Sequence, residues 1–320
     1  MENVVSGERY RILSVGFVKA YVVTMRPYLL FISGITGIAG MSFAPEIQPG
    51  RSILLFLGAF LSYGFGQALT DCFQIDTDSL SAPYRPLTKG IVRKSHVLLV
   101  SVCGLLFCIS VFAYSAPLNL FFGMLAGGGL ATYTFFKRRW WGGPWYNAWI
   151  VAVLCGMAFL AGSSGAAREY PASFLWTLGV VFFGYANFVL SGYFKDIGAD
   201  AATGYNTLPV VFGRKTGAAM SSVLAILSIL SAALAMDHIP LAAGILVTGG
   251  VSCTAIAQIL LHRVRTDEDA HPAISLVVHG YVLLLAGIAV SQKPDWSLSL
   301  FIYYAAFAYV LSVRPAKNQI

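Results

Sequence analysis

Charged residues are scarce in this sequence. Only 11% of its 320 residues are Asp, Glu, Lys or Arg, and 57% are hydrophobic, whereas about 25% of the residues in an average soluble domain are charged. The mean hydropathy is accordingly high, at +0.72. This composition excludes an ordinary soluble domain and predicts a polytopic membrane protein.

Long polar segments are missing as well, because apolar runs follow one another along most of the chain. A membrane helix needs about 20 predominantly apolar residues. We therefore expect an all-α fold, a bundle of nine to ten transmembrane helices. Windows of that length indicate ten candidate spans, at residues 24–44, 52–70, 96–114, 117–136, 146–164, 172–193, 216–236, 239–261, 273–291 and 296–313.

Cysteine is rare and irregularly placed. The five cysteines follow no spacing that is typical of a metal site or a disulfide framework. Four of them fall within predicted spans, where a thiol behaves as a small hydrophobic group. The fifth, Cys72, lies beside a polar passage.

The N-terminal segment lacks the features of a cleavable signal peptide, since Met1 to Lys19 is polar and mixed in charge. We expect residues 1–23 to form a cytoplasmic, partly amphipathic lead-in at the membrane surface. A single transmembrane domain is expected over residues 24–313, followed by a cytoplasmic tail over residues 314–320.

The net charge of +7 does not indicate a nucleic-acid partner, because the basic residues are spread over the connections between spans instead of gathering on one soluble face. The N-terminal tail and every second connection carry most of them, and the alternate connections carry only Arg51, Arg168 and Lys293. By the positive-inside rule, the N-terminus and the basic connections face the cytoplasm. Arg314 and Lys317 place the C-terminus there too, which favours ten spans over nine.

Five of the 14 acidic residues lie in two short passages that each follow an apolar run. The first passage, residues 70–87, carries Asp71, Asp76 and Asp78, and the second, residues 195–200, carries Asp196 and Asp200. In both, the last aspartate leads into a Tyr and then a Pro-Leu or Leu-Pro pair, an echo that predicts two pseudo-repeated halves. The basic connections put both passages on the cytoplasmic side, so we expect them to face each other across a metal site.

The spacing within each passage suits a magnesium site. If the helix before the first passage continues for two more turns, Thr70, Gln74 and Asp78 share one stripe, with Asp71 beside them. One helical turn would likewise aim the carboxylates of Asp196 and Asp200 the same way. Mg²⁺ typically binds through one or two carboxylates, water and substrate phosphates. A solvated loop whose acids serve only topology is the alternative interpretation of the first passage.

Polar side chains at the ends of spans are candidates for contact with a phosphate. Tyr133 and Lys137 share a helical face, so the ammonium group can reach inward, and Lys is a suitable point charge for phosphate. Interfacial anchoring of aromatic and basic side chains is the alternative interpretation. The candidates for binding such a phosphate group or lining its cavity are Arg26, Thr70, Asp71, Arg85, Tyr133, Asn147, Tyr193 and Lys195.

Three motifs occur in order between the predicted spans. They are residues 78–90, which contain Pro83-Tyr84-Arg85-Pro86, then Tyr133-x-x-x-Lys137, and Asp196-x-x-x-Asp200-x-x-x-Gly204-x-x-x-Leu208-Pro209. Over about residues 20–291 the chain resembles the UbiA superfamily of intramembrane prenyltransferases. The wording around Pro83 to Pro86 and Leu208 to Val210 is closest to the branch that contains chlorophyll synthases, among the aromatic prenyltransferases.

This resemblance implies a helical bundle around a central cavity open to the membrane. It implies that Mg²⁺ assists ionisation of an isoprenyl diphosphate, and that the isoprenyl group moves to a lipophilic, most often aromatic, acceptor. The catalytic residues it implies are Asp78, Lys137, Asp196 and Asp200. The metal ligands it implies are Asp71, Gln74, Asp78, Asp196 and Asp200.

The sequence departs from the family in its first motif, which is usually Asn-x-x-x-Asp-x-x-x-Asp. Aligned through Pro83 to Pro86, this chain has Thr70 and Gln74 at the first two positions. Asp71 matches an acid that commonly follows the family's Asn, and Asp76 is additional. Either Asp71, Asp78 and the side-chain oxygen of Gln74 hold the first metal more weakly, or the role of that metal has shifted. A tenth span also exceeds the usual nine.

Two other functions fit parts of this pattern. A UbiA-type terpene cyclase would ionise its diphosphate without an acceptor, and the altered first motif leaves this open. A transporter would more often carry charged or broken helices near the bilayer midplane, whereas here the acids cluster at one face.

Overall fold

The computed structural model describes residues 9–165 and 170–314. Parts of the predicted lead-in and tail, residues 1–8 and 315–320, lie outside the described residues. Over the described ranges the chain forms thirteen α-helices with short 3₁₀ turns between some of them, and no strand occurs in these ranges. The all-α prediction is confirmed.

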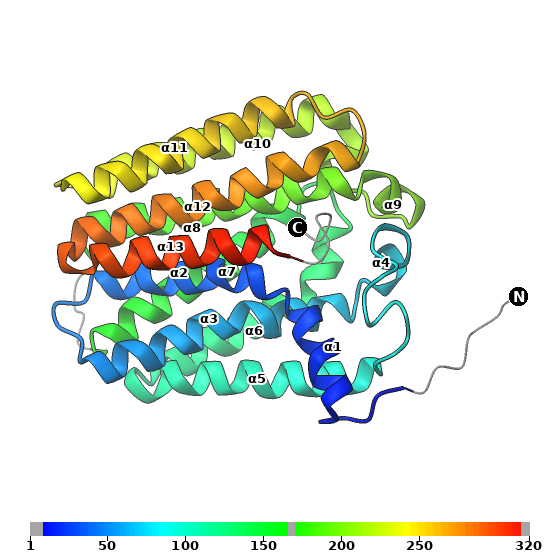
Figure 1. The fold of residues 1–320 in the computed structure, drawn as a ribbon, viewed down its shortest axis with the longest axis horizontal. Helices are drawn as coiled ribbons and strands as arrows, with labels where there is room; N and C mark the ends of the chain where they lie inside the picture. Colours follow the sequence, from blue (N-terminus) through cyan, green and yellow to red (C-terminus); the bar gives the residue numbers. More distant parts are fainter. Residues whose placement is uncertain (1–8, 166–169, 315–320) are drawn as a thin grey trace, which may run out of the picture.

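Ten of the thirteen helices are long, and each coincides with one predicted span (Figure 1). They are α2 (Leu30–Ser42), α3 (Pro49–Asp71), α5 (Lys94–Ser115), α6 (Leu118–Lys137), α7 (Gly143–Gly162), α8 (Ala172–Gly192), α10 (Leu208–Leu234), α11 (Leu241–Leu261), α12 (His271–Gln292) and α13 (Ser297–Ser312). The three short helices are α1 (Val15–Met25), α4 (Ile75–Ser81) and α9 (Ile197–Ala202).

Seven helices of the described chain are long and apolar enough to cross a membrane by themselves, and α1 with residues 27–42 forms a bent pair that adds one more. Both α2, with 13 residues, and α13, with 16, are shorter than a full span. Helix α12 is the most enclosed, since 83% of its apolar window is buried against neighbours that include α2, α8 and α11. The other spanning helices expose more apolar surface, as lipid-facing helices of a membrane protein do.

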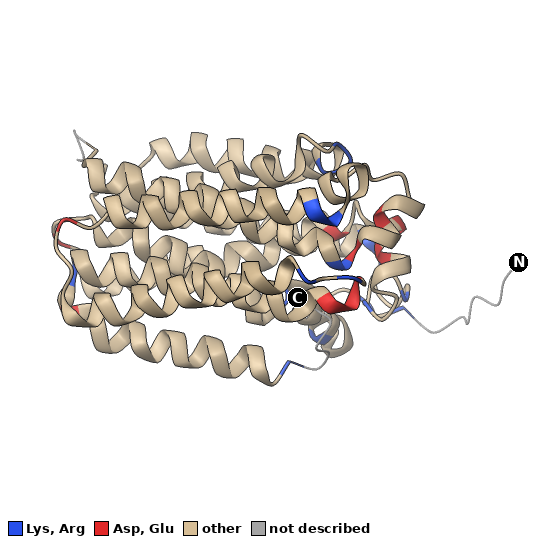
Figure 2. Cartoon of the chain, turned by 90° about the horizontal axis from the view of Figure 1, so that it is seen from above, with Lys and Arg blue, Asp and Glu red and all other residues tan. Residues whose placement is uncertain are grey.

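Most of the charged residues lie at one end of the bundle, and a few lie in the loops at the other end (Figure 2). We call the former the charged end, formed by α4, α9 and segments 72–93, 138–142 and 193–207. There α3 leads into α4, and α8 leads through a 3₁₀ turn, Tyr193–Lys195, into α9. The two short helices contact each other. In both acidic passages a short helix thus follows the end of a long helix.

The predicted continuation of the second span is wrong. Helix α3 ends at Asp71, and residues 72–74 form a tight turn in which Phe73 N donates to Thr70 O and Gln74 N to Asp71 O. Gln74 has φ −123° and ψ 20°, outside the helical region. The turn redirects the chain, so that α4 lies across the end of the bundle instead of prolonging α3.

Candidate active site

A polar cavity opens at the charged end, between the ends of α3, α6 and α8 and the segments that follow them. Every site residue predicted from the sequence lines it except Asp200. Its polar lining consists of Arg26, Tyr63, Gln67, Thr70, Asp71, Gln74, Asp78, Arg85, Tyr133, Lys137, Asn147, Tyr185, Tyr193, Lys195 and Asp196.

The first acidic passage is bound to two arginines. Arg26 Nη2 donates to both carboxylate oxygens of Asp71, at 3.0 and 3.1 Å, and Gln67 Nε2 donates to the same group at 2.6 Å. Arg85 Nη1 lies 2.5 Å from Asp78 Oδ2 and 3.9 Å from the nearer oxygen of Asp71. These side chains are no more than 14% exposed. Hydrogen bonds between ionised groups in such surroundings are among the strong ones.

Arg26 reaches Asp71 from an unusual backbone position. It follows the last residue of α1 and has φ 53° and ψ 72°, in the left-handed region. For a residue other than glycine this conformation costs of order 1 kcal/mol, and such strain is found where the surrounding structure requires it. The bend that it produces, followed by Pro27, carries the guanidinium from the mouth of the first span into the polar cavity.

Lys137, in the last turn of α6, links the two acidic passages. Its Nζ donates to Gln74 Oε1 at 2.9 Å and lies 3.6 Å from Asp200 Oδ1. The predicted common face with Tyr133 is confirmed, because both side chains are buried on α6. Tyr133 Oη is 3.0 Å from Tyr193 Oη. The ammonium group therefore lies where it can stabilise negative charge in the cavity.

The two acids of the second passage differ in their surroundings. Asp196 lines the polar cavity, whereas the Asp200 side chain is fully buried below α4, where Oδ1 accepts a hydrogen bond from Thr77 at 3.2 Å. Asp200 Oδ2 has no hydrogen-bond partner among the described residues. The predicted common direction of the two carboxylates holds only in part, because Asp196 precedes α9 with a non-helical backbone, φ −115° and ψ 8°.

The electrostatic surroundings also separate the acids. Burial raises the pKa of Asp78 above its usual value despite the nearby Arg85. Burial also raises the pKa of Asp200, to about 6, against the effect of Lys137 and with a contribution from Asp196. Burial acts on Asp196 in the same direction, but Lys195, Lys137 and Arg85 outweigh it and hold its pKa below the usual value.

A second group of contacts joins α4 and the segment after α9 to the end of α6. Arg138 Nη2 lies 2.7 Å from Asp76 Oδ2, and Tyr205 Oη donates to Asp76 Oδ1 at 3.0 Å. The Arg138 guanidinium also lies over the Tyr205 ring, 4.5 Å from its centroid. We call these three residues the clasp; it joins α4, the end of α6 and the segment after α9.

Several residues near the site were not predicted. Gln67 lies four residues before Asp71 on the same helix, a spacing that would have indicated it. Thr77 and Tyr205 gave no such signal, because their contacts join passages more than a hundred residues apart. Only the folded arrangement of α4 and α9 brings these residues to the acids.

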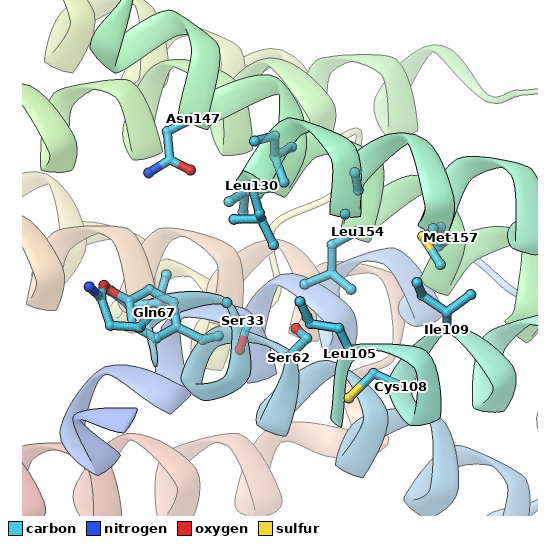
Figure 3. A pocket seen from close by; sticks show the side chains of 18 of the residues that line it. Ser33, Ser62, Gln67, Leu105, Cys108, Ile109, Leu130, Asn147, Leu154 and Met157 are labelled. Carbon is cyan, nitrogen blue, oxygen red and sulfur yellow. The ribbon is translucent and has the colours of Figure 1, made fainter. Parts of the chain in front are cut away.

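An apolar cavity adjoins the polar one and extends away from the charged end, between α3, α5, α6 and α7 (Figure 3). Gln67 and Asn147 lie at one end of it, and Cys108, Ile109 and Met157 lie at the other (Figure 3). Its lining is mainly apolar with a few polar side chains, as in many ligand pockets. The two cavities share Tyr63, Gln67, Thr70, Asn147 and Tyr185.

The donor set suits a hard divalent cation that is shared with a ligand. No three His, Cys, Asp or Glu side chains of the described chain converge as a complete metal cage. Mg²⁺ does not need one, because it usually takes one or two carboxylates and completes its shell with water and phosphate oxygens. Asp196, which lines the cavity, is one such carboxylate, and Asp200, whose buried Oδ2 lacks a partner among the described residues, is the other candidate.

Known proteins with similar sequences support this description. Digeranylgeranylglyceryl phosphate synthase from Thermococcus kodakarensis is 28% identical over 284 residues, which cover 85% of this chain and 98% of that protein. The protein of the same name from Halobacterium salinarum is 25% identical over 235 residues, which cover 73% of this chain and 82% of that protein.

Solved structures show the same fold. A UbiA homologue from Aeropyrum pernix K1 in its apo form gives a TM-score of 0.68 at 17% identity, over 83% of this chain and 98% of that one. A UbiA homologue from Archaeoglobus fulgidus bound to DMAPP and Mg²⁺ gives a TM-score of 0.61 at 17% identity, over 92% of this chain and 99% of that one. The model of the UbiA prenyltransferase family matches residues 31–277. With more than half of its length in that match, the chain belongs to the UbiA prenyltransferase family.

Proposed function

We propose that this protein transfers an isoprenyl group from an isoprenyl diphosphate to a lipophilic acceptor, with Mg²⁺ as cofactor. The observation that carries the proposal is the pair of adjoining cavities, one charged and one apolar, which share five residues. An isoprenyl diphosphate has the same division, because an anionic head is joined to an apolar chain. The A. fulgidus homologue bound to DMAPP and Mg²⁺ supports this choice of donor and cofactor.

The polar cavity would bind the diphosphate head. Arg26, Arg85 and Lys137 line it as cations with side chains at most 14% exposed, so little water screens them. Asp196 and Asp200 would hold Mg²⁺. Asp71, Gln74 and Asp78, from the first acidic passage, line the same polar cavity. The metal, when bound, neutralises part of the charge that develops on the leaving diphosphate.

In the reaction the bond between the allylic carbon and the diphosphate oxygen breaks, and its electron pair leaves with the diphosphate. The positively charged side chains stabilise that leaving group because they are in place before the bond breaks. The allylic cation forms near the shared residues of the two cavities, where the Tyr63 and Tyr185 rings can stabilise a cation. A nucleophilic atom of the acceptor then bonds to the allylic carbon and loses its proton.

The class of acceptor follows from the relatives. Their name describes a glyceryl phosphate that carries two geranylgeranyl groups, and the T. kodakarensis protein aligns over 98% of its length. We therefore propose a prenylated glyceryl phosphate as the acceptor. The aromatic acceptor expected from the wording around Pro83 to Pro86 stays a prediction. Acceptors of both classes are lipophilic and would enter the apolar cavity.

The test uses the full chain in lipid nanodiscs with labelled geranyl, farnesyl and geranylgeranyl diphosphates and Mg²⁺. Each donor is offered alone, with geranylgeranylglyceryl phosphate, and with a hydroxylated aromatic acid. We expect a labelled lipid product that appears only when the acceptor and Mg²⁺ are both present. Product with the aromatic acid alone would replace the proposed acceptor and keep the transferase.

Two outcomes would overturn the transferase proposal. A cyclised hydrocarbon formed without any acceptor would identify a terpene cyclase. The absence of Mg²⁺-dependent turnover with every donor and acceptor, together with uptake of a diphosphate into sealed vesicles, would identify a transporter.

A further inference from the structure

We propose that the two acidic passages bind the diphosphate by different means. The second passage holds a divalent ion, and the first holds the guanidinium groups of Arg26 and Arg85 in place of a second ion. This inference rests on the proposed function and specifies how its site binds the donor.

The first passage is already neutralised by the protein. Asp71 accepts two hydrogen bonds from Arg26, and Asp78 lies 2.5 Å from Arg85. Each of these buried carboxylates has an arginine of its own, so a divalent ion would have to displace a charge-assisted pair in a site of low exposure. In the second passage the ion pair is longer, because Lys137 Nζ stands 3.6 Å from Asp200 Oδ1.

Gln74 removes a further ligand. Its position, between Asp71 and Asp78, carries a neutral amide, and the oxygen of that amide accepts a hydrogen bond from Lys137 at 2.9 Å. An amide oxygen held by a cation is a poor ligand for a second cation, because the two positive charges would repel each other at short range.

The second passage has the opposite character. Asp200 Oδ2 is buried and has no hydrogen-bond partner in the described chain, and Lys137 stands 3.6 Å from the other oxygen. A buried carboxylate oxygen without a partner is unfavourable unless a ligand completes it. Of the two passages, the second therefore holds a carboxylate oxygen that lacks a partner among the described residues, and its other acid, Asp196, lines the cavity.

The arginines can bind diphosphate while they hold the acids. A guanidinium carries five N–H donors, and both bonds from Arg26 to Asp71 come from Nη2 alone. Arg26 and Arg85 line the same cavity as Asp196. The left-handed backbone at Arg26 fixes its guanidinium at this place, which is consistent with a role beyond anchoring the helix at the membrane surface.

The experiment counts the ions directly. The purified full chain is titrated with Mn²⁺ in the presence of geranyl S-thiolodiphosphate, whose C–S bond resists ionisation, and bound Mn²⁺ is measured by electron paramagnetic resonance. We expect one tightly bound Mn²⁺ per chain in the wild type and in Asp78→Asn. Asp200→Asn should lose it, and Gln74→Asp, which adds a carboxylate, should bind two.

The proposed binding of diphosphate by the arginines is tested by measuring the affinity for the same analogue at saturating Mn²⁺. Arg26→Gln should weaken binding of the analogue at least about tenfold and leave the number of bound Mn²⁺ ions unchanged. Arg26→Lys keeps the positive charge but lacks the planar guanidinium, so it should recover part of the lost affinity. Arg139→Gln, at the same end but outside the cavity lining, is the matched control and should bind as the wild type does.

The outcomes separate the inference from the function on which it rests. Two ions in the wild type, loss of the ion in Asp78→Asn, or unchanged affinity in Arg26→Gln would overturn the inference and leave the transferase standing. If the wild type binds no Mn²⁺ with the analogue and transfers no isoprenyl group, the proposed function fails as well. The wild-type count decides the matter even if a variant does not fold.

Discussion

Asp200 has the most unusual surroundings of the site acids. Its side chain is fully buried, one oxygen is held by Thr77, and the other has no partner among the described residues. An unpaired polar atom in such a place costs about 1–3 kcal/mol of stability. A ligand bound at this oxygen would supply the missing contact.

Substitution of the second-passage acids should therefore remove the chemistry. Asp196→Asn and Asp200→Asn are each expected to lower the rate of diphosphate release at least about a hundredfold, because the metal would lose a charged ligand. The measurement is Mg²⁺-dependent release of diphosphate from labelled donor.

Asp295→Asn is the control, because Asp295 is exposed at the opposite end of the bundle, between α12 and α13. It should keep full activity. Near-normal turnover in both Asp196→Asn and Asp200→Asn would contradict the role assigned to this passage.

At the scale of single residues, the sequence predicted which side chains meet but not how they pair. The acids, Lys137 and Tyr133 were found because motif order and helical spacing mark them. The pairing of Arg26 with Asp71 depends on a left-handed residue at the end of α1. No local pattern predicts that conformation, since it is stabilised by contacts 45 residues away in sequence.

At the scale of helices, α4 and α9 contact each other, α4 contributes Asp78 to the wall of the polar cavity, and the clasp ties both segments to the end of α6. Asp76 and Arg138 are each nearly half exposed, so their ion pair is worth less than about 1 kcal/mol. The ring of Tyr205 adds packing under the guanidinium. Because this tie is weak, we expect α4 to open locally more easily than the long helices do.

Loss of the clasp should make α4 open more often. In Asp76→Asn or Tyr205→Phe we expect amide hydrogen exchange in residues 75–81 to rise about threefold, the factor that about 0.6 kcal/mol corresponds to. Hydrogen exchange followed by mass spectrometry measures it.

Arg139→Gln removes a neighbouring base that stacks on Phe135 and Trp141 instead of joining the clasp. Exchange in residues 75–81 should stay at the wild-type rate in this control. Unchanged exchange in both clasp variants would show that other contacts hold α4 closed.

The depth of the apolar cavity should select the length of the isoprenyl chain. Phe112 and Met157 line its far part, and Asn119 fixes them by donating to the backbone oxygen of each, at 3.3 and 3.0 Å. In Met157→Trp we expect kcat/KM for geranylgeranyl diphosphate to fall at least about tenfold relative to geranyl diphosphate, because a larger side chain fills the space of the last isoprene units.

Leu125→Trp is the matched control, since Leu125 lies on the exposed outer face of α6. Its ratio of kcat/KM values should equal that of the wild type. An unchanged ratio in Met157→Trp would place the end of the chain elsewhere.

The helices themselves were largely predictable, and their ends were not. Apolar runs of about 20 residues mark most of the long helices because the bilayer imposes that length, and α2 and α13 are the shorter exceptions. The prediction that Thr70, Gln74 and Asp78 share one face of a continuous helix is wrong, because α3 ends at Asp71. All three nevertheless line the same cavity, because the turn at residues 72–74 brings α4 back over the end of α3.

At the scale of the whole molecule, the charged end predicts the orientation in the membrane. Lys and Arg are concentrated in connections at this end, and the positive-inside rule places it in the cytoplasm. A cysteine at Ser79, exposed on α4, should react with a membrane-impermeant maleimide only after the cells are lysed. A cysteine at Asp295 should react in intact cells.

The background for this experiment is the chain with its five native cysteines replaced. Labelling of both positions from the same side would contradict an arrangement in which α12 and α13 cross the membrane. Labelling of Ser79→Cys in intact cells would reverse the predicted orientation.

The five residues shared by the two cavities have a consequence for the fate of the products. The scissile bond would lie at the boundary between the polar cavity and the apolar cavity, so the two products would form in surroundings of matching polarity. The inorganic anion would then leave through the polar cavity, and the enlarged lipid would remain in the apolar one. Two products that separate in this way would recombine less readily.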